Sequence, residues 1–400
     1  MLGKQGLWPG RRWSDKAGTL AAIHAVENLQ LDPLVILARS HDLMLHSRVI
    51  GYQPALFDEV AYTDRACFDS GGWLAVRPMD ELPYWRTIMR RAATDGSFAD
   101  TVAAHAEEIE VVRRALAERP TVSARDFDAS HGKTVASYRG SKATSVALHY
   151  LWRTGEAMTH HREGFERIYA ATESIAPAHL LACAAEDATD RFIALKGVAF
   201  AGIGRIGPLT YELGRPVTRA EELDLEHELT DLGAIVPVEV EGWRGRQFVL
   251  GADVPVLRDV VADVTPLAWA PIETSTVEEV TFLSPLDPVS ARGRARALFG
   301  FDYVWEIYKR PADMKFGRYT MPILWGDQLV GRMDARMDRK ANALVVNGLW
   351  LEDPATAKDA AFRAALRAGM RRLTMFLHAA RVDASAVSNT RLRASLSAKR

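Results

Sequence analysis

The chain has 400 residues, enough for about two to four domains, and 48% of them are hydrophobic, which is sufficient for a sizeable buried core. Its 50 basic and 51 acidic residues nearly cancel, which argues against a protein that coats nucleic acid through bulk charge but leaves room for a local basic face. The two cysteines, Cys67 and Cys183, form no CxxC spacing, so they argue against a disulfide framework or a structural zinc site and indicate a reducing compartment.

Neither a secretory signal nor a membrane segment is expected. Residues 1–10 carry Lys4 but no long apolar run. No uninterrupted apolar stretch elsewhere is long enough to span a bilayer, which takes about 20 residues. We therefore expect a cytoplasmic protein that does not enter a membrane.

Helical patterns dominate the N-terminal part of the chain. Apolar residues recur at helical spacing over 17–29. Asp32 followed by Pro33 predicts a second helix over 34–48, because Asp caps free amides and Pro suits the first turn. A helix rich in Ala, Glu and Arg is expected over 100–118 and ends at a proline.

Two segments then combine helices with a β-hairpin. In the first, residues 121–126 are typical of a capped helix start, 141–152 predict a helix and 157–170 predict two short strands. In the second, a helix is expected over 216–232 and a hairpin over 233–251. Helix, turn, helix and hairpin is the winged-helix pattern, in which a recognition helix enters a DNA groove and the wing touches the backbone.

From about residue 276 the pattern becomes strand-like. Alternating segments over 319–338 and 342–352 predict strands, a long helix is expected over 355–381, and the polar tail 383–400 is expected to fray. We therefore predict an α+β fold of tandem winged-helix (helix-turn-helix) modules with a C-terminal β-rich domain and a closing helix. The expected divisions are 1–120, 121–185, 186–275 and 276–400.

Gln30 and Asp32 are the candidate catalytic residues. In an extended segment, residues two apart project to the same side, so the amide and the carboxylate could converge on one water. Hydrolysis of an N-glycosidic bond needs such a water on one face of the sugar and gains from negative charge near the oxocarbenium-like transition state. Asp32 would accept the proton and Gln30 would orient the water. The alternative is that Asp32 is only the N-cap of a helix that begins at Pro33.

Two other patterns suggest cofactor chemistry but lack the context for it. The glycines of a GxGxxG at 202–207 are followed by a proline, and no βαβ alternation surrounds them, so a turn-rich linker is favoured over a dinucleotide site. Neither His41 with His46 nor His160 with His161 has residues nearby that complete a coordination set, so no metal is expected. The chain is therefore predicted to need no cofactor.

Three segments, in order along the chain, resemble the YcaQ/AlkZ-like winged-helix DNA glycosylases. Residues 29–54 (LQLDPLVILARSHDLMLHSRVIGYQP) are similar to the family's catalytic segment, and 141–170 to its winged helix with an Arg-x-Gly-Phe-x-Arg-x-Tyr wing. Residues 283–340 are the most distinctive match. The family carries Gln-apolar-Gln or Gln-apolar-Asp, and the Gln30-Leu31-Asp32 form resembles the YcaQ branch.

The resemblance implies a monofunctional DNA glycosylase that excises alkylated purines, including N7-linked guanine adducts, and that in some members unhooks interstrand crosslinks. Because an N7-alkylated guanine is already cationic, the leaving base needs no general acid. The expected partner is double-stranded DNA containing alkylated or crosslinked purines, bound by a monomer. The open alternative is a non-enzymatic winged-helix DNA-binding protein or transcriptional regulator.

Basic side chains in these segments are the candidate DNA contacts. The densest basic region, 291–319, interleaves cations with aromatic residues, which suits contact with a phosphate backbone. Many of these aromatic residues are expected in the core, and no base-stacking role is predicted for them. The full set of candidate contacts is Arg39, His41, Arg48, Lys142, His160, His161, Arg162, Arg167, Arg292, Arg294, Arg296, Lys315 and Arg318.

Overall fold

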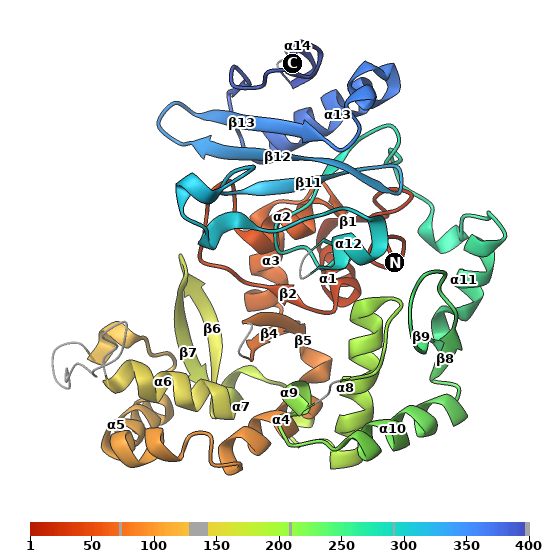
Figure 1. The fold of residues 1–400 in the computed structure, drawn as a ribbon. Helices are drawn as coiled ribbons and strands as arrows, with labels where there is room; N and C mark the ends of the chain where they lie inside the picture. Colours follow the sequence, from red (N-terminus) through yellow and green to blue (C-terminus); the bar gives the residue numbers. More distant parts are fainter. Residues whose placement is uncertain (72–73, 128–142, 208–209, 291–292, 397–400) are drawn as a thin grey trace. The chain divides into compact units, whose positions relative to one another are not determined.

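The computed structural model describes residues 1–71, 74–127, 143–207, 210–290 and 293–396, and it confirms a mixed α+β protein (Figure 1). The chain divides into two compact units. The first comprises Met1–Asp58 together with Val256–Arg400, and the second comprises Glu59–Pro255. The first 58 residues thus share a unit with the C-terminal strands, a different grouping from the four consecutive divisions expected from the sequence.

The first unit contains a five-stranded sheet in the order β10-β11-β12-β13-β14 (Figure 1). Strands β10 to β13 are antiparallel, and β14 runs parallel to β13. The strands are β10 (Thr281–Phe282), β11 (Thr320–Trp325), β12 (Gln328–Asp338), β13 (Ala343–Leu351) and β14 (Arg381–Asp383). The strands predicted over 319–338 and 342–352 are therefore present.

Helix α13 (Ala360–Phe376) packs its apolar face in this unit, with Phe362, Leu366 and Leu373 fully buried. Gly369 makes that packing possible, because a Cβ there would lie 2.3 Å from the carbonyl oxygen of Val280. The tail was expected to fray, but it forms a further helix, α14 (Thr390–Leu396). That helix is held because Leu392 and Leu396 are buried.

The N-terminal part of the first unit is built from short elements. Strand β1 (Trp13–Ser14) pairs in parallel with β3 (Val49–Ile50). The helices are α1 (Asp15–Val26), α2 (Ser40–His46) and α3 (Pro54–Asp58), and β2 (Leu29–Gln30) follows α1. Helix α1 buries Ile23 and Val26, two residues of the expected helical spacing, together with Ala22.

The helix predicted over 34–48 is wrong in its first half, since α2 begins only at Ser40. The carbonyl oxygen of Ile36, which a helix would pair with the amide of Ser40, instead accepts the backbone N–H of Met337 in β12 at 3.0 Å. The segment after Asp32 is therefore an irregular loop that is attached to the sheet.

The second unit begins with a hairpin and three helices. Strand β4 (Cys67–Ser70) pairs with β5 (Ala75–Pro78), and the helices that follow are α4 (Leu82–Thr94), α5 (Ala99–Glu118) and α6 (Ala143–Thr154). The helix predicted over 100–118 is thus confirmed, and the helix predicted over 141–152 is confirmed from Ala143 onward, since residues 141–142 lie outside the described part of the chain. Where a capped helix start was expected over 121–126, the structure has a 3-10 turn at Ala124–Phe127, because the backbone of Val122 pairs with Tyr169.

Both predicted hairpins of the second unit are present (Figure 1). Strand β6 (Ala157–Glu163) pairs with β7 (Glu166–Ala171), after which α7 (Thr172–Ile175) follows. Farther along come α8 (Glu186–Ala201), α9 (Thr210–Leu213), α10 (Arg219–Asp231), and β8 (Ile235–Val238) paired with β9 (Gln247–Leu250). Helix α11 (Val254–Val261) spans the boundary at Pro255 and belongs mostly to the first unit. Helix α10 begins at a capping box in which Thr218 and Glu221 bond each other's backbone amides.

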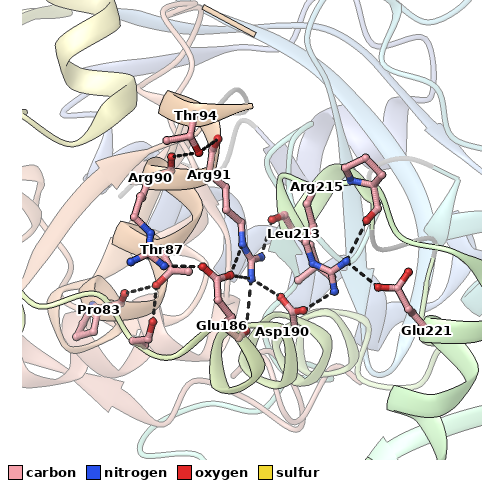
Figure 2. Close-up of polar contacts among 12 residues, drawn as sticks. Pro83, Thr87, Arg90, Arg91, Thr94, Glu186, Asp190, Leu213, Arg215 and Glu221 are labelled. Carbon is pink, nitrogen blue, oxygen red and sulfur yellow. Dashed lines mark hydrogen bonds and ion pairs between the residues drawn. The ribbon is translucent and has the colours of Figure 1, made fainter. Parts of the chain in front are cut away.

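A charged network joins the helices of the second unit (Figure 2). The buried guanidinium of Arg91 on α4 donates to Glu186 and Asp190 of α8 and to the carbonyl oxygen of Leu213. Arg215 donates to the second oxygen of Asp190 at 2.6 Å. Cations and carboxylates alternate along the network, so each buried charge has a partner. The network therefore fixes α4 against α8.

The glycines at 202–207 have structural roles. Gly202 ends α8 with a φ of +72°, a conformation that favours glycine. A dinucleotide motif follows a strand, whereas these glycines follow a helix, so the fold agrees with the linker interpretation. Within the described part of the chain, no helix combines the length and the apolar character needed to cross a bilayer.

Candidate functional site

Gln30 and Asp32 lie at the end of β2 and in the loop after it. Leu29 and Leu31 are buried, whereas Gln30 and Asp32 are partly exposed. This alternation is that of an extended segment, in which residues 30 and 32 project to the same side. The burial pattern is therefore the one expected if the two candidate side chains share one side of this segment.

Asp32 is not a helix N-cap. Its Oδ1 accepts the backbone N–H of Leu34 at 2.8 Å, which closes a turn of the kind that Asp forms with the residue two positions on. No helix follows until α2 at Ser40. The structural alternative for Asp32 is thus reduced to a turn that uses one carboxylate oxygen.

A buried polar cluster lies beside Asp32 and was not identified from the sequence. The hydroxyls of Ser40 and Ser284 are 3.0 Å apart, and Tyr319 is buried next to Ser284. Burial raises the pKa of the Tyr319 hydroxyl, and the negative charge of Asp32 raises it further. Tyr319 therefore stays protonated near neutral pH and presents a buried O–H group near the carboxylate.

Three candidate contacts around α2 are committed to internal interactions. Arg48 is fully buried, and its guanidinium donates to Asp287 at 2.7 and 3.1 Å, so its assignment to DNA is corrected to a structural role. His41 is also buried, with its ring 4.6 Å from that of Phe57. Arg39 is partly exposed and bonds two carboxylates, those of Asp42 and Asp58.

The two arginine candidates on the β6–β7 hairpin converge on one buried carboxylate. Arg162 is ion-paired with Asp69, and the Nε atom of Arg167 lies 3.8 Å from the same group. Only 6% of the Arg162 side chain is exposed, so its predicted contact with DNA is corrected to support of the hairpin. His160 and His161 are partly exposed, and their Nδ1 atoms are 2.8 Å apart.

The C-terminal candidates include the exposed cations. Arg296, Lys315 and Arg318 are exposed and Arg294 is partly buried. They remain candidate contacts with phosphate. Lys142 and Arg292 lie outside the described residues.

Lys315 and Arg318 belong to a loop over residues 302–318 that is closed on the carboxylate of Glu306. That side chain is buried and accepts the amide of Phe316 at 2.8 Å and the ammonium of Lys309 at 2.8 Å. It also accepts the amides of Lys315 and Gly317. Sequence spacing gave no signal for this role of Glu306, because its partners follow it by 3 to 11 residues in irregular backbone.

We expect the 302–318 loop to lose stability in acid. Burial raises the pKa of Glu306, but hydrogen bonds from Lys309 and three amides outweigh it and hold the pKa at about 2. A depressed pKa stabilises the folded loop fully above about pH 4.5 and progressively less as the pH falls towards 2. Hydrogen exchange of the Phe316 amide should show the opening equilibrium rising by up to about tenfold per pH unit in that window. In Glu306→Gln this dependence should be absent, and an identical pH dependence in the two proteins would contradict the assignment.

Known proteins with similar sequences and folds point to one family. Residues 23–376 match the family model described as DNA glycosylase AlkZ-like. Among solved structures, the fold is similar to that of the Streptomyces sahachiroi DNA glycosylase AlkZ, with a TM-score of 0.61 and 11% sequence identity over 96% of each chain. At that identity the second likeness concerns the fold alone, whereas the family model spans most of the sequence. No group of three or more His, Cys, Asp or Glu placed to hold a metal ion occurs among the residues that the structure describes.

Proposed function

The chain belongs to the AlkZ-like DNA glycosylase family and is a DNA glycosylase, and we propose that it acts on alkylated purines of the N7-alkylguanine type in double-stranded DNA. The observation that carries this proposal is the burial alternation over residues 29–32, in which the partly exposed Gln30 and Asp32 alternate with the buried Leu29 and Leu31. The Gln-apolar-Asp form adds unhooking of interstrand crosslinks to the proposed activity.

In the proposed reaction, Gln30 orients a water and Asp32 accepts a proton from it as the oxygen attacks C1′ of the sugar. The glycosidic bond breaks, and its electron pair neutralises the cationic alkylated base, which leaves without a general acid. Water is the nucleophile, so the product is an abasic site in an uncut strand. The negative charge of Asp32 also stabilises the positive charge that develops on the sugar.

The buried Tyr319 hydroxyl supports this role of Asp32. This hydroxyl lies within electrostatic reach of the Asp32 carboxylate. Ser284 and Ser40 form a polar cluster with it, since their hydroxyls are 3.0 Å apart. We propose Tyr319 as a positioning residue for the catalytic carboxylate.

Helix–hairpin pairs in the second unit support the proposal of winged-helix modules. Helix α6 precedes the β6–β7 hairpin, and α10 precedes the β8–β9 hairpin. In a winged helix, the helix enters a DNA groove and the hairpin contacts the backbone. In the first unit, the exposed Arg296, Lys315 and Arg318 are proposed as phosphate contacts.

A panel of duplexes with defined lesions tests the proposed function. The purified protein is incubated with DNA containing N7-methylguanine or a nitrogen-mustard crosslink, and the products are heated in alkali. We expect alkali-dependent strand breaks at the lesion and no breaks without alkali, since only an abasic site is formed. Duplex binding without base release from any lesion would leave the alternative of a non-enzymatic DNA-binding protein. Breaks without alkali would contradict the monofunctional mechanism.

A further inference from the structure

The 302–318 loop presents apolar side chains to solvent although it is rigidly built. Tyr308 is 89% exposed and Val304 is 57% exposed, while the neighbouring Phe301 and Tyr303 are buried. Three backbone amides and one ammonium bond to the buried Glu306 at the base of the loop, so its backbone has a defined conformation. Tyr308 and Val304 thus form an exposed apolar tip on an ordered loop.

Trp305 connects this exposed tip to the candidate site. Its ring lies edge-on to Tyr308 with centroids 6.1 Å apart, and edge-on to Tyr319 with centroids 6.3 Å apart. Its indole N–H donates to the carbonyl oxygen of Arg318 at 3.2 Å. Tyr319 in turn lies within electrostatic range of Asp32. The tip is therefore joined to the polar cluster beside Asp32 through one chain of aromatic contacts, entirely within the first unit.

The exposed cations at the C-terminal end of the loop suit a polyanion. Lys315 and Arg318 are exposed at its C-terminal end, with the ammonium of Lys315 4.7 Å from the centre of the Phe316 ring. Lys309 is ion-paired with Glu306, and that carboxylate is buried, so it offers little repulsion to an approaching phosphate. Aromatic side chains flanked by cations contact unstacked bases and the backbone beside them, and a base step that an inserted side chain opens in a duplex offers such bases.

We propose that Tyr308 and Val304 form a wedge that contacts the bases of duplex DNA beside the alkylated nucleotide, while Lys315 and Arg318 contact the adjacent phosphates. The wedge rests on the proposed function for its position at a lesion. Apolar side chains that enter between base steps unstack them and kink the duplex, which would expose the glycosidic bond to the water at Asp32. The aromatic residues of this region were expected to have no base-stacking role, and the exposure of Tyr308 changes that interpretation.

The test uses a duplex with a stable abasic-site analogue and 2-aminopurine as the neighbouring base. Wild-type protein should raise the 2-aminopurine fluorescence, because the probe loses its stacking. Tyr308→Ala should abolish the rise and weaken binding by about 5- to 150-fold, the range expected for the loss of one base-stacking aromatic. Tyr308→Phe keeps the ring and should behave as wild type.

Leu267→Ala is the matched control, because Leu267 is 91% exposed in the same unit without a place in the loop. It should leave both fluorescence and binding unchanged. Wild-type fluorescence and affinity in Tyr308→Ala, or an equal loss in Leu267→Ala, would overturn the proposal.

The readout does not depend on turnover, because the analogue has no base to release. If the wild-type protein perturbs 2-aminopurine through Tyr308 but releases no alkylated base, the proposed substrate class fails and the wedge stands. If it releases base and Tyr308→Ala leaves the fluorescence unaltered, the wedge fails alone.

Discussion

Asp32→Asn is expected to lower the rate of base release by about 10²- to 10⁴-fold, the usual contribution of a positioned general base. The amide oxygen of asparagine can still accept the backbone N–H of Leu34, so the turn that Asp32 closes at 2.8 Å should persist. The loss would therefore come from the missing negative charge and the missing proton acceptor. Single-turnover release of N7-methylguanine from a duplex measures the rate, and thermal unfolding measures the stability.

Asp353→Asn is the matched control, because Asp353 closes an equivalent turn with the amide of Ala355 at 2.8 Å. That variant should keep both the rate and the melting temperature of the wild-type protein. Gln30→Ala should slow release while retaining duplex binding, since only the orientation of the water is lost. A double variant Gln30→Ala/Asp32→Asn that releases base at the wild-type rate would show that these residues are not the catalytic pair.

Sequence patterns were informative where a structure depends on local spacing. The helix over 100–118 and the hairpin over 157–170 appear as expected because apolar periodicity and turn glycines determine them locally. The start of the second helix was misplaced because the carbonyl oxygen of Ile36 is taken by Met337, some 300 residues later in the chain. A local capping pattern contains no information about such a partner.

The same limit applies to the candidate site. Gln30 and Asp32 were found because an extended segment places residues two apart on one side. Tyr319 was instead counted among the aromatic residues of a basic region, since its position near Asp32 depends on how the sheet is folded. The exposure of a side chain could not be predicted from the sequence either. Tyr303 and Tyr308 are both tyrosines of the same region, yet Tyr303 lies in the core and Tyr308 on the surface.

The assignment of Arg48 as a DNA contact is the largest correction. Removing its side chain should lower the stability of the protein and leave DNA binding unchanged. Its guanidinium bonds Asp287 through two nitrogens and also donates to the carbonyl oxygen of Gln5 at 2.9 Å, with both charged side chains fully buried. Arg48→Ala leaves the Asp287 carboxylate buried without its cation. We expect the free energy of unfolding of the first unit to fall by about 3–5 kcal/mol, measured by urea denaturation or hydrogen exchange.

A double variant separates two effects of the substitution: the cost of leaving the Asp287 carboxylate buried without a cation, and the loss of the ion pair itself. Arg48→Met/Asp287→Leu removes both charges and keeps apolar volume, so it should recover much of the stability that Arg48→Ala loses. At a temperature where every protein is folded, the dependence of duplex binding on salt should be the same for wild type and the double variant, because a buried guanidinium releases no counterions from DNA. A weaker salt dependence in the double variant, with unchanged unfolding of Arg48→Ala, would return Arg48 to the DNA interface. An equal salt dependence, together with a loss of stability in Arg48→Ala, would show that Arg48 is a structural residue of the 29–54 segment. Its role is then to hold the N-terminal part of the chain to the segment that contains Asp287.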